Sequence, residues 1–102
     1  MLTIGEQIRK LRVDQGLPLR RLAAELDIDQ SILSKIERGE RKASREQIIQ
    51  IARIFDVDEK ELLIHYLSDR LLGDLKGEEW ATDALKVAEK KIRYMSHNKN
   101  EE

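Results

Sequence analysis

Four polar side chains gather on the outer face of a short predicted helix, residues 30–38. They are Gln30, Ser31, Ser34 and Lys35. A glutamine amide can bond adenine through two hydrogen bonds, a lysine can donate to guanine, and a serine hydroxyl can donate or accept. An amphipathic helix that is merely solvated would look similar. The segments around this helix therefore indicate whether its outer face binds bases or is simply exposed to solvent.

Those elements predict a helix-turn-helix. Ile32, Leu33 and Ile36 supply an apolar side that packs the helix against its own domain, Asp29 can serve as its N-cap, and Gly39 ends it. A preceding helix is predicted from about residue 18 to residue 26. Its first turn suits a proline, and its buried stripe is Leu19, Leu22, Ala23 and Leu26.

The remaining segments are also helical, so the fold class predicted is all-α. Helices are expected at about residues 3–15, 44–55, 59–72 and 78–96. Gly16 is placed to end the first, Ser44 and Gln47 form a capping-box pattern, and Gly73 is expected to end the fifth. We expect a five-helix DNA-binding domain over residues 1–66, followed by an appended helical arm over residues 67–102.

Composition limits the class of protein. Hydrophobic residues make up 40% of the 102 residues and aromatic residues 4%, so a core of aliphatic side chains is expected. The absence of cysteine excludes disulfides and thiolate metal sites. The charged N-terminus predicts neither a signal peptide nor a membrane span, and the expected location is the cytoplasm.

Charge is unevenly distributed along the chain. Residues 1–55 hold 11 Lys+Arg against 8 Asp+Glu, whereas residues 56–102 hold 8 against 12. The strongest basic segment overlaps the end of the candidate recognition helix and consists of Lys35, Arg38, Arg41, Lys42 and Arg45. Such a segment can meet DNA phosphates although the whole chain carries a net charge of only −1.

Residues 4–57 resemble the phage-repressor and Cro-like helix-turn-helix family, often called the Xre family. The resemblance depends on IRKLR at 8–12, Gly16-Leu17, RLAAELDID at 21–29 and SKIERGERKAS at 34–44. It implies the repressor-like five-helix fold and double-stranded DNA as the partner.

The resemblance also implies roles for individual residues. Gln30, Ser31 and Lys35 match positions that commonly reach bases, with Ser34 beside them. Arg38, Arg41 and Lys42 match the helix end and loop that usually meet the phosphate backbone. Arg12 and Glu37 match a pair that typically forms a partly buried ion bridge, which makes Glu37 a structural residue.

Two positions depart from the family pattern. Leu19 stands where a phosphate-binding glutamine is common, so phosphate anchoring is expected to shift to Arg20 or Arg21. Asp27 stands where the turn usually has glycine. Aspartate tolerates the left-handed conformation better than most residues, so the turn is expected to survive.

The arm carries apolar residues at helical spacing along residues 81–95, and this stripe must be buried either within the chain or against a partner. We expect a homodimer. The interface predicted comprises Leu63, Tyr66, Leu67, Leu71, Trp80, Leu85 and Ile92.

No catalytic constellation, metal site, cofactor motif or effector pocket can be read, and an enzyme is not expected. The favoured function is a sequence-specific transcriptional regulator that binds a palindromic operator as a homodimer. The alternative is an antitoxin-like or other protein-interaction module whose arm binds a partner protein.

Overall fold

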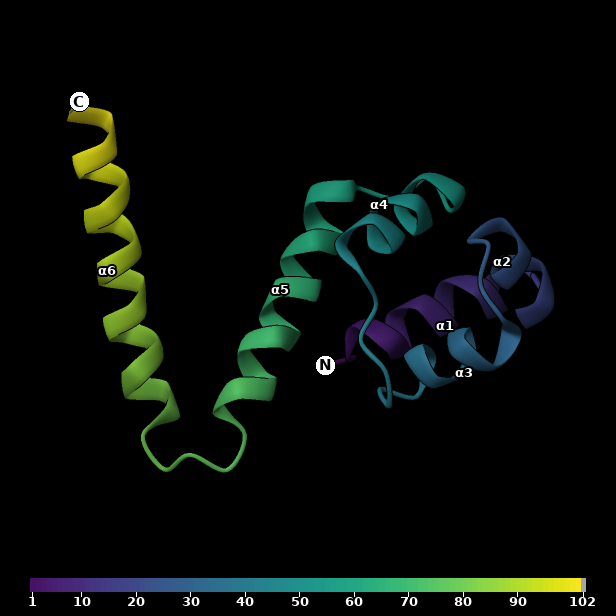
Figure 1. Cartoon of the computed structure of the whole chain (residues 1–102), viewed down its shortest axis with the longest axis horizontal. Coiled ribbons are helices and arrows are strands. Elements are labelled where there is room, and N and C mark those ends of the chain that lie inside the picture. Colours follow the sequence, from purple (N-terminus) through teal and green to yellow (C-terminus); the bar gives the residue numbers. More distant parts are fainter. Residues whose placement is uncertain (102) are drawn as a thin grey trace. The chain divides into compact units, whose positions relative to one another are not determined.

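The structure, a computed structural model, describes residues 1–101, with side chains as far as His97. These residues form six helices and no strand, which confirms the all-α prediction (Figure 1). The helices are α1 (Ile4–Asp14), α2 (Leu19–Glu25), α3 (Gln30–Glu37), α4 (Arg45–Ile54), α5 (Glu59–Leu75) and α6 (Ala81–Glu101). Within residues 1–101, none of these helices has the length and apolarity needed to cross a bilayer.

Contacts divide the chain into two compact units, Met1–Leu71 and Leu72–Glu102. The first unit contains α1 to α4 and most of α5. The second contains the end of α5 and all of α6, so α5 runs through the boundary.

Local hydrogen bonds explain where α1 and α4 begin. The Thr3 hydroxyl accepts from the Glu6 N–H, and the Glu6 carboxylate accepts from the Thr3 N–H, both at 3.2 Å. Ser44 and Gln47 repeat this arrangement at 3.1 and 2.9 Å, as their spacing predicts. Both pairs are capping boxes, which satisfy amides that the first helical turn leaves without a partner.

The ends of α1 to α4 share one geometry, in which a left-handed residue follows the helix. That residue is Gly16 (φ 66°), Asp27 (φ 56°), Gly39 (φ 78°) or Asp56 (φ 52°). After α2, for example, the Ile28 N–H donates back to the Ala23 carbonyl at 3.0 Å. The predicted left-handed turn at Asp27 is therefore confirmed, whereas sequence reasoning missed Asp56.

The core lies within the first unit. Its largest fully buried side chains are Ile8, Leu22, Leu33, Ile48 and Ile51, so each of α1 to α4 contributes at least one. The start of α5 closes this core with Leu62 and Tyr66.

Burial corrects one predicted interface residue. Tyr66 is only 9% exposed and belongs to the core cluster, so its side chain is not available for a dimer contact. Leu63 is partly buried against the same core. The predicted residues Leu67 and Leu71 are exposed.

A close approach of α1 to α3 depends on Gly5. A Cβ atom at this position would collide with the carbonyl oxygen of Ile36 and would lie 2.7 Å from that of Glu37. Because both neighbours are backbone atoms, they cannot move aside as a flexible side chain could. Gly5 therefore lets α1 and α3 pack closely (Figure 1).

Several predicted helix boundaries were wrong by a few residues. Gly73 does not end α5, which continues to Leu75, because the left-handed turn falls instead at Gly77 (φ 83°). As a result α6 starts at Ala81 rather than near residue 78. Pro18 precedes α2 as its N-cap, with an extended ψ of 151°. The third helix ends at Glu37, one residue early.

Candidate nucleic-acid interface

Helices α2 and α3 form the predicted helix-turn-helix. They pack on one another around the left-handed turn at Asp27, and α3 also packs on α1. Leu33, Ile36 and Glu37 form the buried side of α3. Asp29 takes the N-cap position, although its side chain makes no capping hydrogen bond. The helix is thereby held along one side, and its other side is left for contacts outside the domain.

The outer side of α3 carries the residues that the sequence singled out for base recognition. Gln30, Ser31 and Lys35 are exposed, and Ser34 is half-buried beside them. Since residues four apart lie on one face of a helix, Gln30 and Ser34 share a face, as do Ser31 and Lys35. Together they offer an amide, two hydroxyls and an ammonium group, which can donate to and accept from base edges.

Arg38 is tied to its own segment. Its Nε atom donates to the Glu40 carboxylate at 2.6 Å, and its Nη1 atom donates to the Ser34 hydroxyl at 2.8 Å. The sequence assigned Ser34 to bases and Arg38 to phosphate, yet the structure bonds them to each other. A DNA phosphate would have to compete with Glu40 for this guanidinium, and the role of Glu40 was missed.

Other basic side chains flank α3. Arg41 and Lys42 are exposed in the segment that leads to α4, and Arg20 and Arg21 are exposed in the first turn of α2. Leu19, the departure from the family pattern, packs against the core instead. Because the Leu19 side chain faces the core, an apolar residue is suited to this position and a glutamine is not needed there.

The predicted ion bridge between Arg12 and Glu37 is present. The Arg12 guanidinium donates two hydrogen bonds to the Glu37 carboxylate, from Nε to Oε2 at 2.8 Å and from Nη2 to Oε1 at 3.0 Å. It also donates to the Leu17 carbonyl at 3.1 Å. The hydrogen bonds that Arg12 donates to the Glu37 carboxylate raise the pKa of Arg12. The pair joins α1 to the end of α3 and thus fixes the position of the outer face.

A second long-range bond was not predicted. The Asp69 carboxylate, on α5, accepts from the Ile4 N–H at 2.6 Å. This amide belongs to the first turn of α1, where no intrahelical acceptor exists. Asp69 therefore fixes α5 to the start of α1, and residues beyond position 66 contribute to the first unit.

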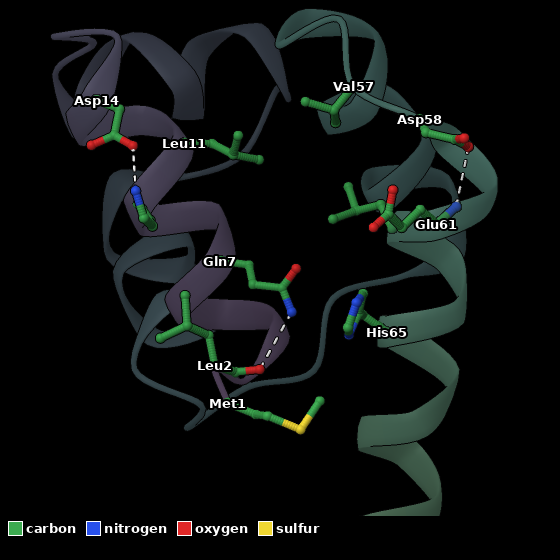
Figure 2. A pocket seen from close by; sticks show the side chains of 11 residues that line it. Met1, Leu2, Gln7, Leu11, Asp14, Val57, Asp58, Glu61 and His65 are labelled. Carbon is green, nitrogen blue, oxygen red and sulfur yellow. Dashed lines mark hydrogen bonds and ion pairs between the residues drawn. The ribbon is translucent and has the colours of Figure 1, made fainter.

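A groove of about 480 Å³ lies elsewhere on the first unit, between α1 and the start of α5 (Figure 2). Glu61 and His65 face it from α5, opposite Gln7 and Leu11 of α1. None of the residues predicted to contact DNA lines this groove. No sequence pattern predicts this groove, because it forms only where two helices far apart in the sequence meet.

The fold and the exposed face of α3 define a helix-turn-helix protein. The chain belongs to the helix-turn-helix family, whose model matches residues 8–62, and the predicted Cro-like, Xre-type resemblance is confirmed. It is 33% identical over 63 residues to control protein C.BamHI from Bacillus amyloliquefaciens, covering 61% of this chain and 78% of that protein.

Two solved structures are also similar. The restriction-modification controller protein C.AhdI from Aeromonas hydrophila is 34% identical, with a TM-score of 0.53, over 58% of this chain and 89% of its own. SinR, the master regulator for biofilm formation, in complex with DNA, is 31% identical, with a TM-score of 0.53, over 60% of this chain and 98% of its own. Both matches cover more than half of this chain.

Proposed function

We propose that this protein is a sequence-specific DNA-binding transcriptional regulator whose helix α3 enters the major groove. The observation that carries this proposal is the exposed face formed by Gln30, Ser31 and Lys35 on a helix whose opposite side is buried. A helix of this type in a helix-turn-helix presents its first turns to base edges. The similar proteins are described as a controller and as a regulator in complex with DNA, which supports this assignment.

Phosphate contacts are assigned to the flanking cations. Arg41 and Lys42 follow α3, and Arg20 and Arg21 lie at the start of α2, so both ends of the helix-turn-helix carry positive charge. Arg38 contributes if it exchanges Glu40 for a phosphate. These contacts supply affinity for any sequence, while the outer face of α3 supplies the preference.

The regulator acts as a homodimer on a palindromic operator in the cytoplasm. A single helix-turn-helix reads a short site, and two copies related by a two-fold axis read half-sites roughly 34 Å apart. The dimer contacts are assigned to the exposed or partly buried residues of the predicted interface: Leu63, Leu67, Leu71, Trp80, Leu85 and Ile92. No catalytic role is assigned to any residue.

A second candidate is a protein-interaction module whose arm binds a different protein. It is favoured by the exposed large apolar residues of the arm and of late α5. Such residues are often covered by a partner. In that case the arm would capture a different polypeptide, and DNA binding would be secondary.

Selection of bound sites from random duplex DNA tests the proposal and separates the candidates. Enrichment of a palindrome is expected for a dimeric regulator. Enrichment of a single half-site would retain the DNA-binding function and reject the dimer. Recovery of no preferred sequence would reject the regulator and leave the interaction module.

A further inference from the structure

Helix α6 carries two apolar stripes. The first stripe is Ala81, Leu85, Ala88, Ile92 and Met95, and the second stripe is Trp80, Ala84, Val87 and Tyr94 with Lys91. Members of each stripe alternate in steps of four and three residues, the spacing at which side chains line up along a helix. Trp80 is in register, because its carbonyl accepts from the Ala84 N–H at 2.9 Å.

The two stripes face different directions. Each member of the second stripe stands one position before a member of the first, so at 3.6 residues per turn their centres are separated by about 100° around the helix axis. The remaining face is charged and includes Asp83, Lys86, Lys90 and Arg93. A partner helix laid along the first stripe would therefore leave the second stripe in water.

The second stripe is too apolar for that position. Trp80 is 69% exposed and Tyr94 67% exposed, and Val87 is half exposed between them. Large aromatic side chains contribute strongly to interfaces when they are buried. A helix with two apolar faces at about a right angle is typical of a bundle, in which each helix has two neighbours.

Late α5 offers a complementary surface. Its exposed leucines include Leu67, Leu71 and Leu72. Residues 67–80 hold four Asp+Glu against two Lys+Arg, whereas residues 81–97 hold four Lys+Arg against two Asp+Glu. The end of α5 and the turn after it are thus acidic where α6 is basic, which favours pairing between them.

We propose that a second copy of this chain covers both stripes of α6, the first with its own α6 and the second with the end of its α5. The proposal deepens the homodimer described above and rests on it. The dimer interface is then a helical bundle rather than a single pair of α6 helices. Val87 and Tyr94 are added to the interface predicted from sequence.

The available apolar surface suits a dimer. Among residues 1–97, thirteen large apolar residues are exposed, and ten of them lie between Ile64 and Met95. If each buries roughly 60–120 Å², as is usual for side chains of this size, the total is about 600–1,200 Å². A stable interface needs about 800 Å² from each partner.

Trp80 tests the proposal in the unaltered full chain, because it is the single tryptophan. Its emission is measured across a dilution series alongside the molecular mass from sedimentation. We expect the emission to shift to longer wavelength as the dimer dissociates, with the same midpoint as the mass. If the dimer dissociates without a change in the emission, the proposal is overturned, because the second stripe would then be exposed to solvent in both the monomer and the dimer.

Matched substitutions test the two stripes separately. Val87→Lys on the second stripe and Ile92→Lys on the first are each expected to raise the dimer Kd at least about tenfold, because a buried lysine is costly. Asp83→Lys on the charged face should change it less than about threefold. Circular dichroism and the conservative variant Val87→Ile report whether the helix itself is retained. If Val87→Lys dimerises like the unaltered chain, the bundle is wrong.

The mass of the unaltered chain separates this proposal from the proposed function. A chain that remains monomeric at every concentration yet binds a preferred DNA site overturns the bundle and keeps the regulator. A dimer that loses association in both stripe variants but binds no preferred DNA keeps the bundle and rejects the regulator.

Discussion

Arg12 and Glu37 join α1 to α3 through a two-pronged ion pair that is largely removed from solvent. The side chains are 13% and 4% exposed, and the two N–O distances are 2.8 and 3.0 Å. Because Glu37 is the last residue of α3, this pair holds the end of α3 on the domain. In the function proposed above, stability and DNA recognition are therefore linked at this position.

Replacing Arg12 with methionine should lower the free energy of unfolding by about 3 kcal/mol, since it leaves the buried Glu37 carboxylate without its partner. Arg12→Met combined with Glu37→Leu should recover most of that loss. Urea unfolding of the three chains measures the effect. The matched control is Lys10→Met, whose pair with Asp14 is 64% and 59% exposed and contributes less than about 1 kcal/mol. If Arg12→Met and Lys10→Met lowered the free energy of unfolding equally, the structural role of Glu37 would be contradicted.

Gly5→Ala should destabilise the protein by about 1–3 kcal/mol, because the added methyl group forces α1 away from the α3 backbone. Alanine is the better helix former, so the sign of the change reports the close approach alone. Gly73→Ala is the control, since a Cβ there meets nothing within 4 Å. Gly73 lies in the last turn of α5, where that variant should gain at most about 0.5–1 kcal/mol. Thermal unfolding distinguishes the two, and a stabilising Gly5→Ala would be incompatible with the packing described.

The capping box of α1 should make stability depend on acid. Hydrogen bonds from the Thr3 backbone and side chain lower the pKa of Glu6 below its ordinary value of 4.5. A carboxylate whose pKa is depressed by folding stabilises the folded state above its unfolded pKa, and this contribution disappears as pH falls through the folded value.

Glu6→Gln should therefore flatten the loss of stability below pH 4.5, because an amide does not titrate. The equivalent position in α4 is already Gln47, so Gln47→Glu should add an acid-dependent contribution of the same sign. Unfolding measured from pH 3 to 7, a range around the ordinary pKa of a glutamate, checks both changes. Identical pH profiles for Glu6→Gln and the unaltered chain would contradict the assigned carboxylate cap.

Sequence patterns predict local features of this fold well and long-range contacts poorly. The capping boxes, the helix-turn-helix and the left-handed turn at Asp27 depend on neighbours within a few residues. The hydrogen bond from the Ile4 N–H to the Asp69 carboxylate joins residues 65 positions apart. No local sequence pattern predicts that Asp69 accepts it. Gly73 carries the usual signal for a helix end, yet the turn formed four residues later at Gly77.

The candidate site shows the same division. The exposed positions of Gln30, Ser31 and Lys35 follow from helical periodicity. The resemblance to a known family predicted the Arg12–Glu37 pair, which residue spacing alone does not indicate. The bonds from Arg38 to Glu40 and to Ser34 depend on side-chain geometry beyond the end of α3. Helical periodicity also indicates the second stripe of α6, although the interface predicted from sequence includes only Trp80 from it.

Arg41→Gln and Lys42→Gln should each weaken binding to all DNA sequences by a similar factor. Each should also reduce the slope of log K against log salt by about 1, because one phosphate contact is lost. Lys60→Gln, an exposed lysine at the start of α5, is the control and should leave the slope unchanged. Titrations at several salt concentrations measure the slopes. A slope unaffected by Arg41→Gln and Lys42→Gln would remove these residues from the phosphate contacts.

The most direct test of the recognition helix is the ratio of affinities for a selected operator and for random duplex DNA. Gln30→Ala and Lys35→Ala should each reduce operator affinity by about 1–3 kcal/mol and relax the preference at one base pair. Their affinity for random DNA should change far less than their affinity for the operator. Gln50→Ala, an exposed glutamine on α4, should leave the ratio as it is. An unchanged ratio and base preference in both α3 variants would contradict the assignment of α3 as the helix that reads DNA.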